Sequence, residues 1–174
     1  MYLISIYFDK NTEYKIKSYM KQIAKNTGNQ MMLEGKIPPH ITVSAFHADS
    51  LECAEVIFER ICKQVKAGNI QWVSVAAFLP QVIYLSPVLN EYLQRLSETI
   101  YKEVMQMETA EPRGYYQPYR WMPHATLAKH LEKEQMKTAF EIMQNQFGPF
   151  ESRVTKIGLA ETNPYTDLAV FELK

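Results

Sequence analysis

The sequence predicts an α+β fold in which mixed, largely antiparallel sheets carry helices on their outside. Segments with the two-residue alternation of strands take turns with segments of helical periodicity along the 174 residues. Many strand candidates adjoin another strand directly, which favours antiparallel pairing over the long crossovers that parallel strands need. No low-complexity tract or Gly/Ser-rich linker interrupts this pattern, so the length fits a single domain.

The first part of the chain is expected to form two strands, each followed by a helix. Residues 2–8 and 40–46 have the strand pattern. Residues 29–39, which lie directly before the second strand, are expected to form a loop. Apolar side chains at helical spacing precede Gly28, which ends the first helix. Asp49, with a glutamate three residues later, resembles a capping box that opens the second helix.

The rest of the chain alternates in the same way. Two strands are expected at 70–79 and 82–85, and Ser86–Pro87 is expected to start the most amphipathic helix because proline favours the first helical turn. The segment 108–121 is polar, rich in tyrosine and irregular. The remaining elements are a strand at 124–129, a helix at about 133–147, and two strands at 152–160 and 167–173.

Composition and charge describe an ordinary soluble globular protein, with 47% hydrophobic and 22% charged residues. The 19 basic and 19 acidic side chains cancel, which argues against an extended nucleic-acid surface but leaves room for a pocket that holds one phosphate. No apolar run has the length of a membrane span, and the N-terminal residues lack the features of a signal peptide. We therefore expect a cytoplasmic protein without membrane association. Cys53 and Cys62 lie on one predicted helix and are expected to be reduced core residues.

Two short segments repeat one pattern. Residues 39–43 read PHITV, and residues 123–127 read PHATL. Each segment places proline before histidine and threonine two residues after it. A single copy would be interpreted as a proline-initiated strand with a half-buried histidine. A chance match at two histidines of four has a probability on the order of 10⁻⁴, so the pair indicates a shared role.

At this spacing each segment projects an imidazole and a hydroxyl from the same face of a strand. Residues i and i+2 of a strand point the same way, so His40 lies beside Thr42, and His124 lies beside Thr126. The apolar residues between and after them point to the opposite face, where we expect a core beneath helices. Proline fixes the entry into each strand and donates no ladder hydrogen bond.

Two such walls facing each other would suit in-line displacement at phosphorus. Imidazole titrates at about 6.5, so one ring can accept a proton from the nucleophile while the other donates a proton to the leaving oxygen. Two threonine hydroxyls can donate hydrogen bonds to the non-bridging phosphate oxygens as their charge builds. These residues predict a metal-independent phosphoesterase that needs no cofactor.

Two other classes of function use the same residues. One is a non-catalytic nucleotide or RNA-end binding module that retains the two-histidine pocket, although binding alone would not need both histidines. The other is a metal enzyme with His40 and His124 as ligands. Zinc sites usually have three or more protein ligands, and neither segment contains Cys, Asp or Glu, which disfavours the metal site.

The two segments resemble the paired HxTx motifs of the two-histidine (2H) phosphoesterase superfamily, at residues 40–43 and 124–127. Within it, the chain is most similar to the 2′-5′ RNA ligase branch, also called RNA 2′,3′-cyclic phosphodiesterases. Trp121 matches the aromatic residue that leads into the second motif. The resemblance implies a bilobal, pseudo-twofold fold of residues 1–174. Two antiparallel sheets would form a central cleft with helices outside, and each lobe would contribute one motif.

The resemblance also implies a role for each motif residue. His40 would be the proton donor, His124 the proton acceptor, and Thr42 and Thr126 would bind the phosphate. The implied activity is hydrolysis of 2′,3′-cyclic phosphate ends of RNA, or of a related small cyclic phosphodiester, with 2′-5′ RNA ligase activity in reverse. The implied partner is therefore a nucleotide or RNA end, bound by a monomer.

Two features near the second motif have no assigned role. Lys129 stands where the branch often has arginine, and lysine keeps the charge but loses the bidentate geometry. The loop Tyr115–Arg120 would either clamp a nucleoside or form an ordinary surface loop. The histidines that follow each motif, His47 and His130, would either extend the site, with His130 on the face of His124, or be solvated strand ends, which is the favoured interpretation.

Overall fold

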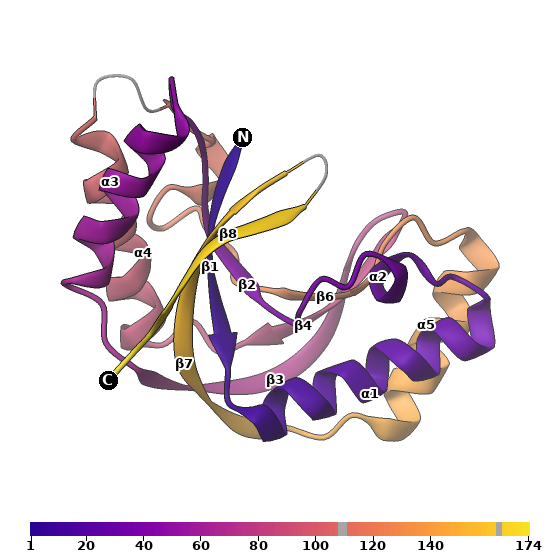
Figure 1. The fold of residues 1–174 in the computed structure, drawn as a ribbon. Helices are drawn as coiled ribbons and strands as arrows, with labels where there is room; N and C mark the ends of the chain where they lie inside the picture. The colour runs from indigo at the N-terminus through magenta and orange to yellow at the C-terminus, as the bar shows by residue number, and fades with distance from the viewer. Residues whose placement is uncertain (108–110, 163–164) are drawn as a thin grey trace.

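The computed structural model describes residues 1–107, 111–162 and 165–174. Its strands are antiparallel, and its long helices lie outside them (Figure 1). The predicted α+β class is therefore confirmed. In chain order the elements are β1 (Tyr2–Phe8), α1 (Lys10–Thr27), α2 (Met31–Glu34), β2 (Ile41–His47), α3 (Leu51–Cys62), β3 (Gly68–Phe78), β4 (Val82–Pro87), α4 (Glu91–Met105), β5 (Glu111–Pro112), the 3-10 turn η1 (Gly114–Tyr116), β6 (Ala125–Ala128), α5 (Lys133–Gln146), β7 (Phe150–Glu161) and β8 (Thr166–Glu172).

The strands pair in the order β5-β2-β1-β7-β3-β4-β6, with β8 added on β7. The long strands β3 and β7 change partners along their length. Residues 150–154 of β7 pair with residues 68–72 of β3, whereas residues 154–161 of β7 pair with β1. Beyond residue 72, β3 pairs with β4. The two expected sheets are thus continuous with each other, joined by five residue pairs that we call the β3–β7 seam.

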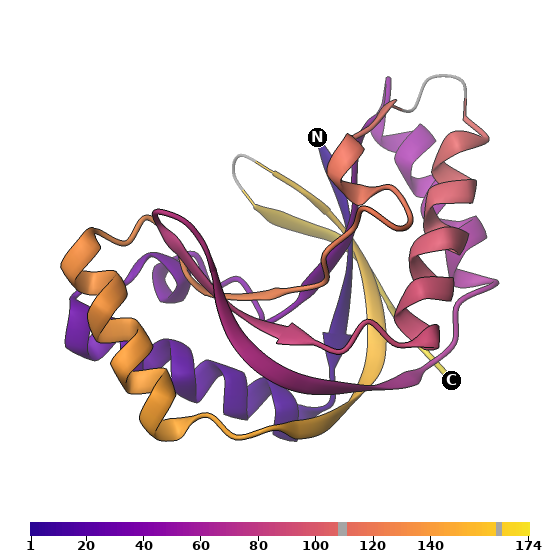
Figure 2. The same ribbon diagram turned by 180° about the vertical axis from the view of Figure 1, so that it is seen from behind.

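Helices cover the outer side of each half of this sheet (Figure 2). Helices α3 and α4 pack together against the half that contains β1, β2 and β7. Helices α1 and α5 pack together against the half that contains β4 and β6, although α1 comes from the beginning of the chain. The N-terminal segment therefore contributes its strand to one half of the molecule and its helix to the other.

Most of the helix and strand pattern follows from apolar periodicity, but two helix starts differ from the prediction. Ser50, not Asp49, caps α3, because its side chain accepts a hydrogen bond from the backbone N–H of Cys53. Asn90 caps α4, and Pro87 instead ends β4, where it pairs with β3. A short helix, α2, also interrupts the expected loop at 29–39.

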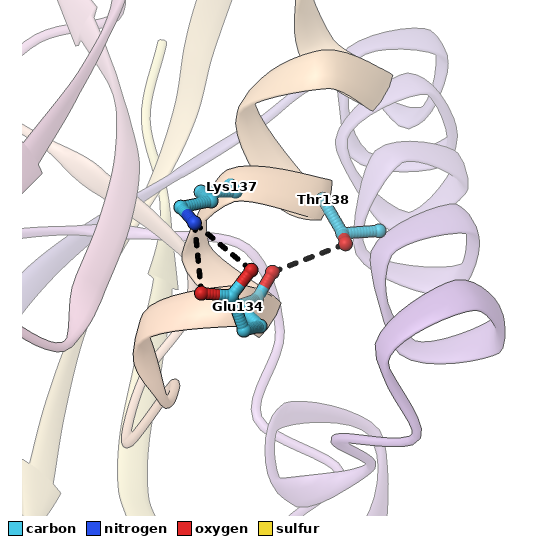
Figure 3. A network of polar contacts seen from close by, with 3 residues as sticks. All are labelled: Glu134, Lys137 and Thr138. Atoms are coloured by element: carbon cyan, nitrogen blue, oxygen red, sulfur yellow. Dashed lines mark hydrogen bonds and ion pairs between the residues drawn. The ribbon is translucent and has the colours of Figure 1, made fainter.

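Helix α5 follows directly after the second motif, and its first turn is well anchored. A capping box between Glu132 and Gln135 opens it, and the Gln135 amide also donates to the carbonyl of Thr27 at the end of α1, at 2.9 Å. Figure 3 shows the neighbouring contacts, in which Lys137 Nζ lies 2.8 Å from Glu134 Oε1. This exposed pair contributes little stability, so the capping box and the contact with α1 are what position the helix.

Two further expectations concern the surface and the cysteines. In the part of the chain that the structure describes, no helix combines the length and the apolar character needed to cross a bilayer. Cys53 and Cys62 both lie on α3 as free thiols, but they are half-buried and not part of the buried core, against which only Cys62 packs.

Candidate active site

The two motifs occupy matching places in the two halves of the sheet. His40 directly precedes β2, and His124 directly precedes β6. The apolar residues that were expected to face the core are all buried: Ile41, Val43, Ala125 and Leu127. On β6 this burial agrees with the predicted alternation, since Thr126 is only half-buried, whereas on β2 the polar residues Thr42 and Ser44 are buried too.

Both imidazoles are held by the same local hydrogen bond. Nδ1 of His40 lies 2.7 Å from the carbonyl oxygen of Pro38, and Nδ1 of His124 lies 2.9 Å from the carbonyl oxygen of Met122. A carbonyl oxygen can only accept, so Nδ1 carries the proton in each ring. In both histidines, Nε2 is the nitrogen left to accept or donate a proton.

His40 lies near two tyrosine rings whose hydroxyls both contact one carboxylate. Its ring centroid is 6.2 Å from that of Tyr7 and 6.0 Å from that of Tyr165, and the Tyr165 ring is nearly parallel to it, at 27°. The hydroxyls of Tyr7 and Tyr165 lie 3.1 and 2.9 Å from Asp167 Oδ1 and 3.0 Å from each other. Burial raises the pKa of both phenols, so both stay protonated and can donate to Asp167.

His124 lies against a different pair of aromatic rings. The edge of Phe78 is T-shaped to it at a centroid distance of 4.8 Å, and Tyr84 lies at 5.2 Å. Tyr84, on β4, is buried and pairs with Thr126 in the sheet, so it packs beside the second motif. Each imidazole thus has two aromatic side chains beside it. The aromatic neighbours of His40 contact a carboxylate, that of Asp167, whereas those of His124 contact none among the residues that the structure describes.

The two motif threonines differ in their surroundings. Thr126 lines an open cavity, whereas Thr42 is only 9% exposed and its hydroxyl lies 3.4 Å from that of Ser5 on β1. The indole N–H of Trp121 donates to the carbonyl of Thr42 at 3.0 Å. This bond joins the first motif to the segment that leads into the second, so the two motif strands are fixed against each other.

A cavity of about 550 Å³ contains residues of both motifs, and we call it the His40 cavity. His40 comes from the first motif and Thr126 from the second, and Lys129 adds a positive charge. The Asn29 amide positions the residue after the strand by donating to the carbonyl of Lys129 at 3.1 Å. The structure thereby brings together an imidazole, a hydroxyl and an ammonium group around one space.

A second cavity of about 450 Å³ contains His124, and we call it the His124 cavity. Residues 124 and 126 point from the same face of β6, one into each cavity, so the two cavities lie next to each other along this strand. The predicted site residues are therefore distributed over adjoining spaces rather than gathered in one pocket.

Burial lowers the pKa of both histidines. For His40 the hydrogen bond to Pro38 opposes this effect, the charges of His124 and Lys129 add to it, and the carboxylate of Asp167 opposes it. For His124 the hydrogen bond to Met122 opposes the effect of burial. The charge of His124 thus contributes to the shift of His40, whereas burial and the bond to Met122 are what act on His124.

The histidines that follow each motif are exposed. His47 ends β2, and His130 follows the end of β6 with a left-handed φ of 55°. Both are solvated ends of strands, as predicted, although His130 also borders the His40 cavity. Within the described residues, no group of three or more His, Cys, Asp or Glu side chains has the arrangement of a metal site.

Sequence reasoning did not find Tyr7, Tyr165 and Asp167. Tyr165 and Asp167 belong to the last hairpin, far from both motifs in the chain. One signal was available for Tyr7: it lies two residues after Ser5 on β1, and Ser5 pairs with Thr42. The polar residues of the first strand therefore face the same side as the first motif, which places Tyr7 next to His40.

One antiparallel sheet thus has a His-x-Thr segment in each of its two halves, the arrangement that the resemblance to the 2H phosphoesterases implies. The chain matches the model of the 2′-5′ RNA ligase superfamily over residues 18–165, and it belongs to this family. The family consists of phosphoesterases and ligases, so the phosphoesterase class predicted from the two motifs is confirmed at this level.

Solved structures show the same fold at low sequence identity. A crystal structure of a phosphoesterase superposes with a TM-score of 0.67 and 14% identity, covering 99% of this chain and 97% of that one. Escherichia coli LigT complexed with 3′-AMP superposes with a TM-score of 0.65 at 13% identity, covering 99% of this chain and 97% of LigT. TT0787 of Thermus thermophilus superposes with a TM-score of 0.64 at 16% identity, covering 99% of this chain and 97% of TT0787. No curated protein sequence matches the chain.

Proposed function

We propose that the protein is a metal-independent phosphoesterase that hydrolyses 2′,3′-cyclic phosphate ends of RNA, or a related small cyclic phosphodiester. One observation carries the proposal: both imidazoles use Nδ1 for the same backbone hydrogen bond and keep Nε2 free. A base on one side of phosphorus and an acid on the other are what in-line displacement requires. Residues 1–174 would form one domain of two pseudo-symmetric lobes, each contributing one motif.

In this mechanism His124 Nε2 accepts a proton from water as the water oxygen attacks phosphorus. The bond between phosphorus and the 3′ oxygen breaks, and His40 Nε2 donates its proton to that oxygen, which leaves a 2′-phosphate. Burial lowers the pKa of His40, whereas the hydrogen bond to Pro38 and the carboxylate of Asp167 favour the charged form that a proton donor needs. Thr42 and Thr126 donate to the non-bridging oxygens, and Lys129 balances their charge.

The ligands of a protein with the same fold support a nucleotide substrate. LigT has been crystallised with 3′-AMP and with phosphate, which are chemically close to the products of cyclic phosphate hydrolysis. With the 5′-hydroxyl of a second RNA in place of water, the same proton transfers would form a 2′-5′ linkage: the hydroxyl oxygen attacks phosphorus, its proton goes to His124, and the 3′ oxygen leaves with the proton of His40. Ligation is therefore the expected side activity.

The test is hydrolysis of adenosine 2′,3′-cyclic phosphate by the wild type and by single-histidine variants. His40→Ala and His124→Ala should each lower turnover by roughly 10²–10⁴-fold. His47→Ala, which removes an exposed histidine at the end of β2, is the matched control and should keep its turnover. Product chromatography identifies the phosphate position.

The assignment is wrong if either motif variant retains turnover close to that of the wild type. A protein that binds the nucleotide but does not cleave it would instead be a binding module. Addition of a chelator tests metal dependence, and full turnover in its presence is the expected result.

A further inference from the structure

The His124 cavity has a lining that acid–base chemistry alone does not require. Besides His124, it is lined by Arg113 and Arg120 and by aromatic or thioether side chains: Phe78, Tyr115, Tyr116, Trp121 and Met122. Guanidinium groups bind phosphate through paired hydrogen bonds, and aromatic faces stack on nucleobases. The lining therefore has the chemistry of a nucleotide subsite with a second anionic group.

The loop that supplies both arginines is held in place at three points. The backbone N–H of Arg113 donates to the carbonyl of Ala45 on β2 at 2.8 Å. The hydroxyl of Tyr119 donates to Glu98 on α4 at 2.8 Å, and the indole of Trp121 donates to Thr42. These bonds fix the backbone of the loop, so binding a ligand there orders only the exposed arginine side chains and not the loop itself.

The same loop carries local backbone strain and exposed aromatic surface. Tyr119 has a φ of 65°, a left-handed conformation that a tyrosine rarely adopts. Tyr115 is 84% exposed, and Met122 is 47% exposed beside the cavity. Exposed aromatic and apolar side chains that gather around a concave surface are a common mark of a binding site.

The position of this cavity identifies what would cover it. His124 and Thr126 project into neighbouring cavities from one strand, so a ligand whose reacting phosphate lies between the motifs extends into both spaces. A nucleoside cyclic phosphate has only one phosphate. The nucleotide at an RNA end has a second phosphate, on its 5′ oxygen, at the other end of the sugar.

We propose that the His124 cavity is a second subsite of the same active site, in which Arg113 and Arg120 hold the 5′-phosphate of the terminal nucleotide. The inference builds on the proposed function and narrows its substrate class. It selects phosphorylated RNA ends over free nucleoside cyclic phosphates. A nucleobase stacks against the aromatic side chains of the cavity.

The test compares the binding of 3′-AMP with that of adenosine 3′,5′-bisphosphate by isothermal titration calorimetry. The wild type should bind the bisphosphate more tightly by roughly 10- to 100-fold, the range expected for hydrogen bonds to a charged group. Arg113→Ala and Arg120→Ala should each reduce this ratio. Arg60→Ala, an exposed arginine on α3, is the matched control and should leave the ratio unchanged.

A ratio near one in the wild type, or a ratio unchanged in both variants, would overturn the subsite. The ratio is measured without turnover, so it is independent of the proposed hydrolysis. Turnover of adenosine 2′,3′-cyclic phosphate without a bisphosphate preference rejects the subsite alone. An arginine-dependent preference without turnover supports the subsite and rejects the hydrolase.

Discussion

The two motif histidines share one backbone contact but differ in their charged neighbours. Each ring is oriented through Nδ1, so both Nε2 atoms are available for proton transfer. Only His40 has a carboxylate, that of Asp167, among the groups that shift its pKa. Two groups with different electrostatic surroundings can be in opposite protonation states at one pH, as acid–base catalysis requires.

Turnover should therefore depend on pH in a bell shape with its maximum below about 6.5, the ordinary pKa of histidine. The base His124 must be neutral and the acid His40 must be charged. Burial lowers the pKa of both, so the acidic limb and the alkaline limb both move to lower pH. The measurement is kcat/KM of the cyclic nucleotide between about pH 5 and 9, where a flat profile would contradict paired imidazoles.

The Asp167→Asn variant tests which histidine determines the acidic limb of the pH profile and which determines the alkaline limb. The carboxylate raises the pKa of His40, so its loss should move the alkaline limb to lower pH. The acidic limb should stay in place, because Asp167 is not among the groups that shift the pKa of His124. A shift of the acidic limb instead would exchange the roles of the two histidines.

Strand β7 shapes the surroundings of His40 through a single glycine. A Cβ atom on Gly158 would lie 2.7 Å from Cε2 of Tyr7 and 3.2 Å from the carbonyl oxygen of Ala169 on β8. The Tyr7 ring is buried and its hydroxyl lies within hydrogen-bonding distance of Tyr165 and Asp167, so it has little freedom to move away. Glycine at this position is what lets the tyrosine ring lie flat on the strand beside His40.

Gly158→Ala should lower the free energy of unfolding by about 1–3 kcal/mol, the usual cost of overpacking, and should also reduce turnover. Urea denaturation and the cyclic nucleotide assay measure the two effects. Gly148→Ala is the control, since its Cβ would meet no atom within 4 Å. An unchanged stability in Gly158→Ala would show that the Tyr7 ring is not confined in this way.

The first residues of helices α3 and α4 show how well the sequence predicts where an element begins. Asp49 and Ser50 are both good caps, and which one is used depends on where the chain leaves β2. Val88 and Leu89 continue the helical spacing of α4 backwards, but they are exposed and lie before the helix. Apolar periodicity therefore predicts that an element exists better than it predicts where it begins.

The motif pair could be predicted because each copy is local and its spacing matches a strand. The neighbours of His40 could not, since Tyr7 comes from β1 and Tyr165 and Asp167 come from the β7–β8 hairpin. Their meeting depends on β7 pairing with both strands, a long-range register that no single segment encodes. The loop with Arg113 and Arg120 was recognised from its composition, but its cavity emerges only from the packed structure.

At the scale of the whole molecule, the β3–β7 seam joins the halves that carry the two motifs. Trp72 lies in this seam, fully buried, and its indole N–H donates to the hydroxyl of Ser152 on β7 at 3.0 Å. The core is also shared, because α1 packs with α5 on the half opposite to β1. Neither half has a complete core or sheet of its own.

The protein should therefore unfold in one cooperative transition. Far-ultraviolet circular dichroism and the fluorescence of Trp72 and Trp121 should give the same midpoint in urea. Trp72→Ala should cost about 3–5 kcal/mol, as is typical for a buried tryptophan. Two separate transitions in the wild type would mean that the halves are independent units.

The place of β7 between β1 and β3 has a consequence for biosynthesis. One of the two neighbours of β1 is β7, whose residues are translated long after those of β1 because α1 to α5 and β2 to β6 lie between them in the chain. At common elongation rates the first strand waits on the order of ten seconds for this partner, with one edge unpaired. A nascent chain arrested before β7 would expose that edge, so truncated translation products of this gene should be substrates for chaperones and proteases.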